Sequence, residues 1–269
     1  MRHFQDQFRE LYTCYNRREF VHPDPLEFLY DYNHVRDREI AALVAACLAY
    51  GNVWQILKSV SSVLEIMDSP SRFLKSSSRA SLLKAFEHFK YRFTTGRELA
   101  TMLYGAKRVI ESHGSLQSCF MKGIHDDHET VAPGLSAFVK ELSAVFDAKP
   151  RSLLPSPDLG SACKRWNLFM RWMVRKDDVD PGGWDQVPTS KLIVPVDTHM
   201  HRFSLRLGIT GRKQADLRTA CEITDAFRKI APDDPVRFDF ALTRLGIRDD
   251  TDPEEFLNSC LRKSTKSSH

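Results

Sequence analysis

Apolar residues recur at helical spacing along nearly the whole chain, and this pattern constrains the fold more than any other feature. Phe8, Leu11 and Tyr15, for example, fall on one face of a helix. Comparable patterns occupy residues 38–51 and 53–67 and stretches near 79–90, 97–112 and 131–146. The short run at 192–196 is interrupted by Pro195, which argues against a strand inside a sheet. The sequence therefore predicts an all-α fold.

The longest apolar run, residues 40–50, belongs to the helix expected over 38–51. Asp37 stands just before that helix, where a side-chain oxygen can accept free amides, and Gly51 can end it. The next expected helix carries an apolar stripe of Trp54, Leu57, Val60 and Leu64. Because a membrane-spanning helix needs about 20 apolar residues, the sequence predicts no association with a membrane.

The chain has 269 residues, of which 42% are hydrophobic and 28% charged, as in globular proteins. That length suits one large domain or two small ones. Pro, Ser and Gly are densest over residues 147–162, which is typical of a connecting segment. We therefore expect a single helical domain over residues 1–269, with two lobes and a break near 147–160.

The net charge of +4 and the pI near 8.7 permit an anionic partner such as nucleic acid without requiring one. The six cysteines are scattered and include no CxxC pair, so they predict neither a zinc or iron–sulfur site nor a disulfide framework. Free thiols fit a reducing compartment. The charged beginning, MRHFQDQFRELY, lacks a secretory signal. We expect a cytoplasmic protein with no cofactor.

A basic helix is expected after the Pro-rich segment, in GSACKRWNLFMRWMVRK. Lys164, Arg171 and Arg175 share one face at i, i+7 and i+11, with Arg165 beside them. No acidic residue lies between Ser161 and the end of this segment. Such a row could follow a phosphate backbone. The alternative is a surface helix whose arginines are solvated or paired.

Two histidines and an aspartate lie within the five residues DTHMH at 197–201, and a metal site is one interpretation. In a strand, His199 and His201 would point to the same side, as in metal-dependent hydrolases. The segment instead has helical spacing in Met200, Phe203 and Leu207. Residues i and i+2 of a helix do not converge, so a metal site is the less favoured interpretation.

Asp197 stands directly before this expected helix and is therefore predicted to be its N-cap. The positive field of a helix N-terminus keeps a carboxylate ionised. An ionised carboxylate there could stabilise a cationic sugar and orient or deprotonate a nucleophile. A purely structural cap is the alternative.

The segment VPVDTHMHRFSLRLGIT resembles the VDTHVxRVxxRLGL segment of the helix-hairpin-helix DNA glycosylases, the endonuclease III superfamily. The matching residues are Asp197, Thr198, His199, Arg202, Arg206, Leu207 and Gly208. The resemblance implies a two-lobed helical fold, with Asp197 as the general catalytic residue. It also implies that Lys164, 33 residues earlier, is the nearest candidate for the lysine that attacks the sugar. Tyr50 and Asn52 correspond to the loop that faces DNA.

A closer resemblance, over most of the chain, is to a bacterial family of unknown function that is remotely related to these glycosylases. It rests on DREIAALVAACLAYGN, LLPSPDLGSACKRWNLFMRWMVR and LIVPVDTH. The glycosylase hairpin LPGVGxKTA is replaced here by LLPSPDLGSACKR. The four-cysteine iron–sulfur cluster and the glutamine that wedges into DNA are also missing. These departures affect the features that the resemblance would assign to phosphate binding, to lyase chemistry and to base extrusion.

Three functions follow as hypotheses. The first is a DNA repair hydrolase that binds double-stranded DNA and excises a damaged base, with or without lyase activity, through Asp197 and Lys164. The second is an inactive nucleic-acid-binding module of the same fold, and the third is a metal-dependent hydrolase. The expected nucleic-acid contacts are Ser161, Arg165, Arg171, Arg175, His199, Arg202, Tyr50 and Asn52; no metal ligand is assigned.

Overall fold

The structure, a computed structural model, describes residues 4–148, 152–246 and 252–266. The α-helices are α1 (Gln5–Tyr15), α2 (Val35–Leu48), α3 (Val53–Met67), α4 (Pro70–Ser76), α5 (Arg79–Ala85), α6 (Gly96–His113), α7 (Leu116–Met121), α8 (Ala132–Ser143), α9 (Lys164–Val174), α10 (Thr198–Arg206), α11 (Leu217–Arg228), α12 (Asp239–Leu245) and α13 (Pro253–Lys266). Short 3₁₀ helices are η2 (Arg18–Phe20), η3 (Pro25–Asp31), η4 (Pro157–Leu159) and η5 (Thr189–Lys191).

The all-α prediction is confirmed. The described part of the chain contains only one small hairpin of two strands, β1 (Lys90–Tyr91) and β2 (Thr94–Thr95). The strands pair antiparallel, with Lys90 opposite Thr95 and Tyr91 opposite Thr94. The sequence pattern did not predict this hairpin, because two residues per strand are too few to show alternation.

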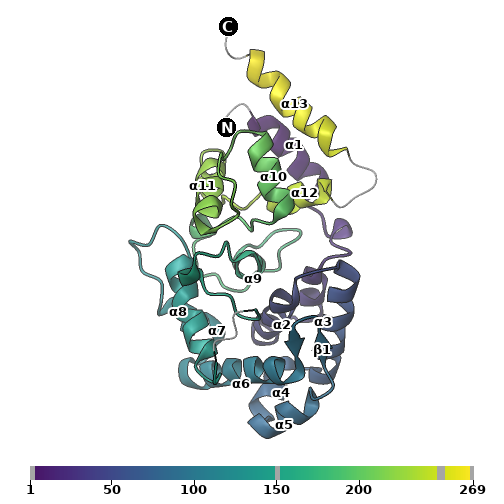
Figure 1. Cartoon of the computed structure of the whole chain (residues 1–269), viewed down its shortest axis with the longest axis vertical. Coiled ribbons are helices and arrows are strands. Elements are labelled where there is room, and N and C mark those ends of the chain that lie inside the picture. Colours follow the sequence, from purple (N-terminus) through teal and green to yellow (C-terminus); the bar gives the residue numbers. More distant parts are fainter. Residues whose placement is uncertain (1–3, 149–151, 247–251, 267–269) are drawn as a thin grey trace.

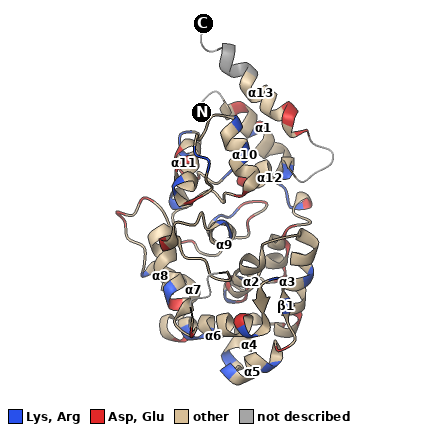
Figure 2. Cartoon of the chain, viewed as in Figure 1, with Lys and Arg blue, Asp and Glu red and all other residues tan. Residues whose placement is uncertain are grey.

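The helices form two groups along the long axis of the molecule (Figure 1). Helices α2 to α8 occupy the lower group, and α10 to α13 occupy the upper group together with α1. Helix α1 packs against α12 and α13, so the two ends of the chain lie in the same group. Lysines and arginines occur in both groups, interspersed with acidic residues (Figure 2).

Helix α9 lies between the two groups and packs against α2. The apolar stripe expected on it is buried, and so are the other sides of the helix, including Trp172 and Arg171. Phe138 and Trp184 pack against its aromatic residues, with ring centroids 5.8 Å apart for Phe138 and Trp166. Lys164 and Arg165, at its start, and Leu168 are partly exposed, but the rest of the helix is buried and has no solvent face for a basic row.

Helix α2 begins and ends earlier than expected. It starts at Val35, after His34, and stops at Leu48. Asp37 therefore lies inside its first turn, and the prediction that Asp37 caps this helix is wrong. The Asp37 carboxylate accepts a hydrogen bond from the Ser71 N–H at 2.7 Å, in the first turn of α4. Asp37 does accept a backbone N–H in the first turn of a helix, but that helix is α4 and not α2.

Helix α3 buries Leu57, Val60 and Leu64 as expected, but Trp54 is 59% exposed. None of the six cysteines, all of which lie in the described ranges, forms a disulfide, and four of them are buried. Within the described ranges, no helix has the length and apolar character needed to cross a membrane. The break expected near 147–160 includes residues 149–151, which lie outside the described residues. The remainder contains the buried Leu153 and Leu154 and the turn η4.

Candidate active site

Asp197 is the N-cap of α10, as the sequence predicted. Its backbone is extended, with φ −112° and ψ −172°, and its Oδ1 accepts the Met200 N–H at 2.8 Å. The preceding residues 192–196 are buried, and the Val194 N–H donates to Thr224 Oγ1 at 3.0 Å. This fixed segment sets the position of the Asp197 carboxylate.

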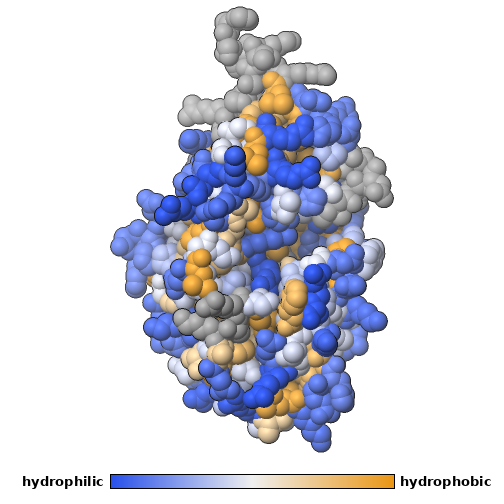
Figure 3. Space-filling model, in the orientation of Figure 1, coloured by the Kyte–Doolittle hydropathy of each residue, from blue (hydrophilic) through white to orange (hydrophobic). Residues whose placement is uncertain are grey.

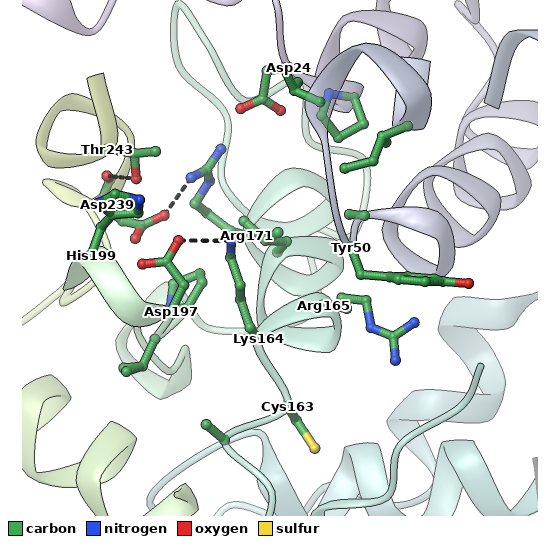
Figure 4. Close-up of a pocket in the computed structure, with 18 of the residues that line it drawn as sticks. Asp24, Tyr50, Cys163, Lys164, Arg165, Arg171, Asp197, His199, Asp239 and Thr243 are labelled. Carbon is green, nitrogen blue, oxygen red and sulfur yellow. Dashed lines mark hydrogen bonds and ion pairs between the residues drawn. The ribbon is translucent and has the colours of Figure 1, made fainter. Parts of the chain in front are cut away.

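Lys164 is the first residue of α9, and its Nζ lies 2.9 Å from Asp197 Oδ2 (Figure 4). The side chains are 38% and 25% exposed, respectively, so solvent and a ligand can reach both. The chain enters α9 through Gly160 at φ 74° and Cys163 at φ 48°. The Gly160 carbonyl accepts the Leu217 N–H at 2.9 Å, which ties this turn to the start of α11.

The pKa of Asp197 is lowered. Burial alone would raise it, but the charge of Lys164, the Met200 amide and the nearby His199 outweigh burial. The carboxylate is therefore ionised at neutral pH and well below it. It can stabilise positive charge next to it, and it can accept a proton only from a strong donor or during a reaction.

The pair lies in the wall of a cavity of about 560 Å³. The loop after α2, the start of α9, the start of α10 and α12 all contribute to the lining. Figure 4 shows Tyr50 and Arg165 on the side opposite Asp197 and His199. The space-filling view shows hydrophilic residues around a hollow near the middle of this face (Figure 3). A cavity of this size fits a ligand as large as a nucleotide base.

A second pair, Arg171 and Asp239, lines the same cavity. Arg171 Nη1 donates to Asp239 Oδ2 at 2.5 Å, and both side chains are 3% exposed. Burial raises the pKa of Asp239 to about 6, against the opposing effect of Arg171. The pocket thus holds two carboxyl groups whose pKa values are shifted in opposite directions. Arg171 Nη2 is buried and has no hydrogen-bond partner.

The prediction that Arg171 and Arg175 form an exposed basic row with Lys164 is wrong. Arg171 also donates to Asp180, at 3.1 Å, and Arg175 is paired with Asp180 and Asp234. Both arginines are buried. Their acidic partners come from the loop after α9 and from the segment around α12, so inspection of the basic segment alone did not reveal them.

Arg165 and Tyr50 both line the cavity and hold its wall together. Arg165 Nη1 donates to the Cys47 carbonyl at 2.6 Å, and its guanidinium lies 5.1 Å from the centre of the Tyr50 ring. The Tyr50 hydroxyl donates to the Tyr91 carbonyl at 3.1 Å. Much of the hydrogen-bonding capacity of these two residues is therefore used within the protein.

Ser161 is exposed and lines the cavity, with its Oγ accepting the Cys163 N–H at 3.2 Å. Asn52 is exposed but does not line the cavity. Its side-chain oxygen caps α3 by accepting from the amides of Trp54 and Gln55. Asn52 therefore has a structural function, which agrees with its place directly before the helix expected over 53–67.

His199 and His201 point to different neighbours. His199 is exposed and lines the cavity, whereas His201 is buried with Nε2 2.8 Å from the Arg212 carbonyl. Arg202 is exposed and lines a smaller neighbouring cavity of about 260 Å³. Across the described ranges, no group of three His, Cys, Asp or Glu residues is placed to hold a metal ion.

Sequence reasoning missed the acidic residues of the cavity other than Asp197. Asp239 and Asp24 also line it, and Asp24 Oδ2 accepts from Arg244 Nη2 at 2.9 Å. Asp239 begins α12 and Asp24 precedes η3, far apart along the chain. Neither belongs to a recognisable motif. An Asp amid apolar residues, as in RFDFALTRLG, is the one local signal of a buried charge.

Comparison with known proteins gives one match. A family model described as a protein of unknown function, DUF2400, matches residues 24–248, a range that includes both charged pairs of the cavity. No curated protein and no solved structure matches the chain. None of these comparisons connects the family to the helix-hairpin-helix glycosylases. The chain belongs to the DUF2400 family.

Proposed function

We propose that this protein is a DNA glycosylase that excises a damaged base through Lys164 and Asp197. The observation that carries the proposal is the 2.9 Å contact between Lys164 Nζ and Asp197 Oδ2 in the wall of the cavity. Lys164 and Asp197 are 33 positions apart in the sequence and lie at the starts of two different helices. A nucleophile beside a carboxylate, in a cavity of base size, is the arrangement that such a reaction requires.

In the proposed reaction, Lys164 transfers a proton to Asp197 and its lone pair attacks C1′ of the nucleotide. The glycosidic C1′–N bond breaks, and its electron pair leaves with the base, which takes up a proton. Opening of the sugar ring then gives an imine between Lys164 and C1′. Water hydrolyses this imine, or loss of the 2′ proton expels the 3′ phosphate by β-elimination. Asp197 passes the proton that it took from Lys164 to the departing base, and the carboxylate that this regenerates stabilises positive charge on the sugar.

The base would have to leave the duplex to reach the cavity, as in other enzymes that act on a single base. The cavity wall offers it Tyr50 and the buried Arg171–Asp239 pair. A second candidate function, duplex binding without chemistry, is favoured by the ion pair itself, because a lysine held as a charged partner is not a nucleophile.

Borohydride trapping tests the proposal. Purified protein is incubated with duplexes that carry an abasic site or an oxidised, alkylated or deaminated base, and a covalent adduct is expected. Lys164→Ala should abolish the adduct. Lys176→Ala is the matched control, since Lys176 is exposed just beyond the other end of the same helix. If folded wild-type protein binds duplex DNA but yields neither an adduct nor a released base on any substrate, duplex binding without chemistry is the correct function.

A further inference from the structure

Another cavity, of about 440 Å³, lies between α3 and the β1–β2 hairpin. Its lining includes three cations, Lys58 from α3 and Lys90 and Arg92 from the hairpin, together with His88. The remaining lining residues are polar or aromatic, and no Asp or Glu is found among the described residues that line it. We refer to it as the hairpin groove.

The three cations of the hairpin groove are exposed, and within the described ranges none of them has an ion-pair partner. This distinguishes them from Arg171 and Arg175, whose charges are neutralised by buried aspartates. The acidic residue at the edge of the groove, Glu87, contacts His88 at 3.2 Å. The groove is therefore a local concentration of available positive charge.

The hairpin groove shares a wall with the candidate active site. The Tyr91 hydroxyl, on the groove side, donates to the Tyr50 carbonyl, on the cavity side. Arg92 packs directly on Gly51, where an added Cβ would lie only 2.7 Å from Arg92 Nη1. Gly51 also has φ +98°, a conformation that side-chain-bearing residues rarely adopt. The close approach of Arg92 to the cavity thus depends on this glycine.

Two large aromatic residues are exposed on the same two elements. Phe93, at the turn of the hairpin, is 71% exposed, and Trp54, in the first turn of α3, is 59% exposed. The Arg92 guanidinium lies 5.8 Å from the centre of the Phe93 ring. Exposed aromatic side chains beside unpaired cations are typical of surfaces on which bases stack while phosphates bind.

We propose that the hairpin groove binds the phosphate backbone of duplex DNA next to the nucleotide that enters the cavity, with Phe93 stacked on a neighbouring base. This inference rests on the proposed function, because the cavity fixes where the DNA must pass. Arg171 and Arg175 are buried and cannot bind phosphate there, so we infer that the charge that anchors the strand comes from the lower group of helices. Nucleic acid fits the groove better than an acidic peptide does, because both aromatic and cationic groups border the base-sized cavity.

The test is the salt dependence of binding to a fluorescent duplex that contains a stable abasic-site analogue. Each phosphate contact contributes about 0.9 to the slope of log K against log salt concentration. The triple variant Lys58→Ala, Lys90→Ala, Arg92→Ala should therefore lower the slope by about 2.7. The control triple variant, Arg79→Ala, Lys84→Ala, Lys140→Ala, removes the same charge from exposed sites, two on α5 and one on α8, and should keep a nearly wild-type slope.

Phe93→Ala should weaken binding by roughly fivefold or more at constant salt, since one stacked base is lost, while leaving the slope unchanged. All of the substituted side chains are exposed, and thermal unfolding of each variant verifies that the fold is intact. A wild-type slope in the hairpin-groove variant would overturn the inference. The inference would also be overturned if that variant lost binding to anionic vesicles or to an acidic peptide while its DNA binding stayed unchanged.

The two proposals fail separately. If wild-type protein gives the borohydride adduct and the hairpin-groove variant binds DNA with a wild-type slope, the glycosylase proposal stands and the groove proposal is wrong. If the slope falls as expected but no substrate gives an adduct or a free base, the groove binds DNA and the glycosylase proposal is wrong. If the wild-type protein binds no duplex even at low salt, both are wrong.

Discussion

The two ends of α9 carry positive charges with very different surroundings. At the start, Lys164 has a single carboxylate partner, Asp197, and both side chains are partly exposed. At the far end, Arg171 and Arg175 are buried among Asp180, Asp234 and other carboxylates. A buried pair is costly to separate, whereas a partly exposed pair can exchange its partner for a ligand. Loss of one partner at the far end is therefore expected to destabilise the fold, whereas Lys164 at the near end can exchange Asp197 for a ligand.

The largest effect is expected at the buried end. Arg175→Ala leaves the fully buried Asp180 short of one partner, and loss of one member of a buried pair costs about 3–5 kcal/mol of unfolding free energy. Urea denaturation measures it. The exposed Lys176→Ala, one position along, is the control. A loss below about 1 kcal/mol would mean that the two ends of α9 do not differ as described.

At the start of α9 we expect a large effect on activity and a small effect on stability. Lys164→Ala should leave no covalent adduct in the trapping assay, because the amine itself forms the bond. Its stability should change by less than about 1 kcal/mol, since a partly exposed ion pair contributes little. Trapping and urea denaturation on the same preparation separate the two effects. A large loss of stability would place Lys164 with the structural arginines.

Asp197 combines a cap with a charge, and two substitutions separate them. Asp197→Ala removes both and should cost about 1 kcal/mol of stability, the usual value for a lost N-cap. Asp197→Asn keeps an oxygen that can accept the Met200 N–H, so stability should stay near wild type while base release falls. Equal activity of the Asn variant and wild type would leave Asp197 as a cap only.

The smallest effect concerns Asp239. Burial raises its pKa to about 6 in the folded protein, so between this value and the ordinary pKa of Asp the folded state binds more protons than the unfolded state. Protonation of Asp239 therefore stabilises the fold as pH falls, by about 0.4 kcal/mol between pH 7 and 6. The difference in stability between wild type and Asp239→Asn should shift by this amount. A difference that is constant with pH would contradict the raised pKa.

Local sequence predicted what depends on local structure. The helix α10 and its cap Asp197 followed from spacing and a capping residue within a dozen positions. The contact between Lys164 and Asp197 spans 33 positions, and only the family resemblance suggested it. The surroundings of Arg171 and Arg175 were predicted wrongly, because Asp239 and Asp234 lie 68 and 59 positions away. Burial of most of α9 is a tertiary property that its own residues only partly reveal.

The packing of α1 against α12 and α13 has a consequence for synthesis of the protein. Helix α1 is synthesised before α12 and α13, which cover it. Asp239, in α12, and Arg244, the partner of Asp24, complete the cavity from the same late segment. During translation the helices of the lower group can fold in order as they emerge. The cavity cannot close until residue 244 has left the ribosome, so an incomplete chain would present Lys164 without a finished site.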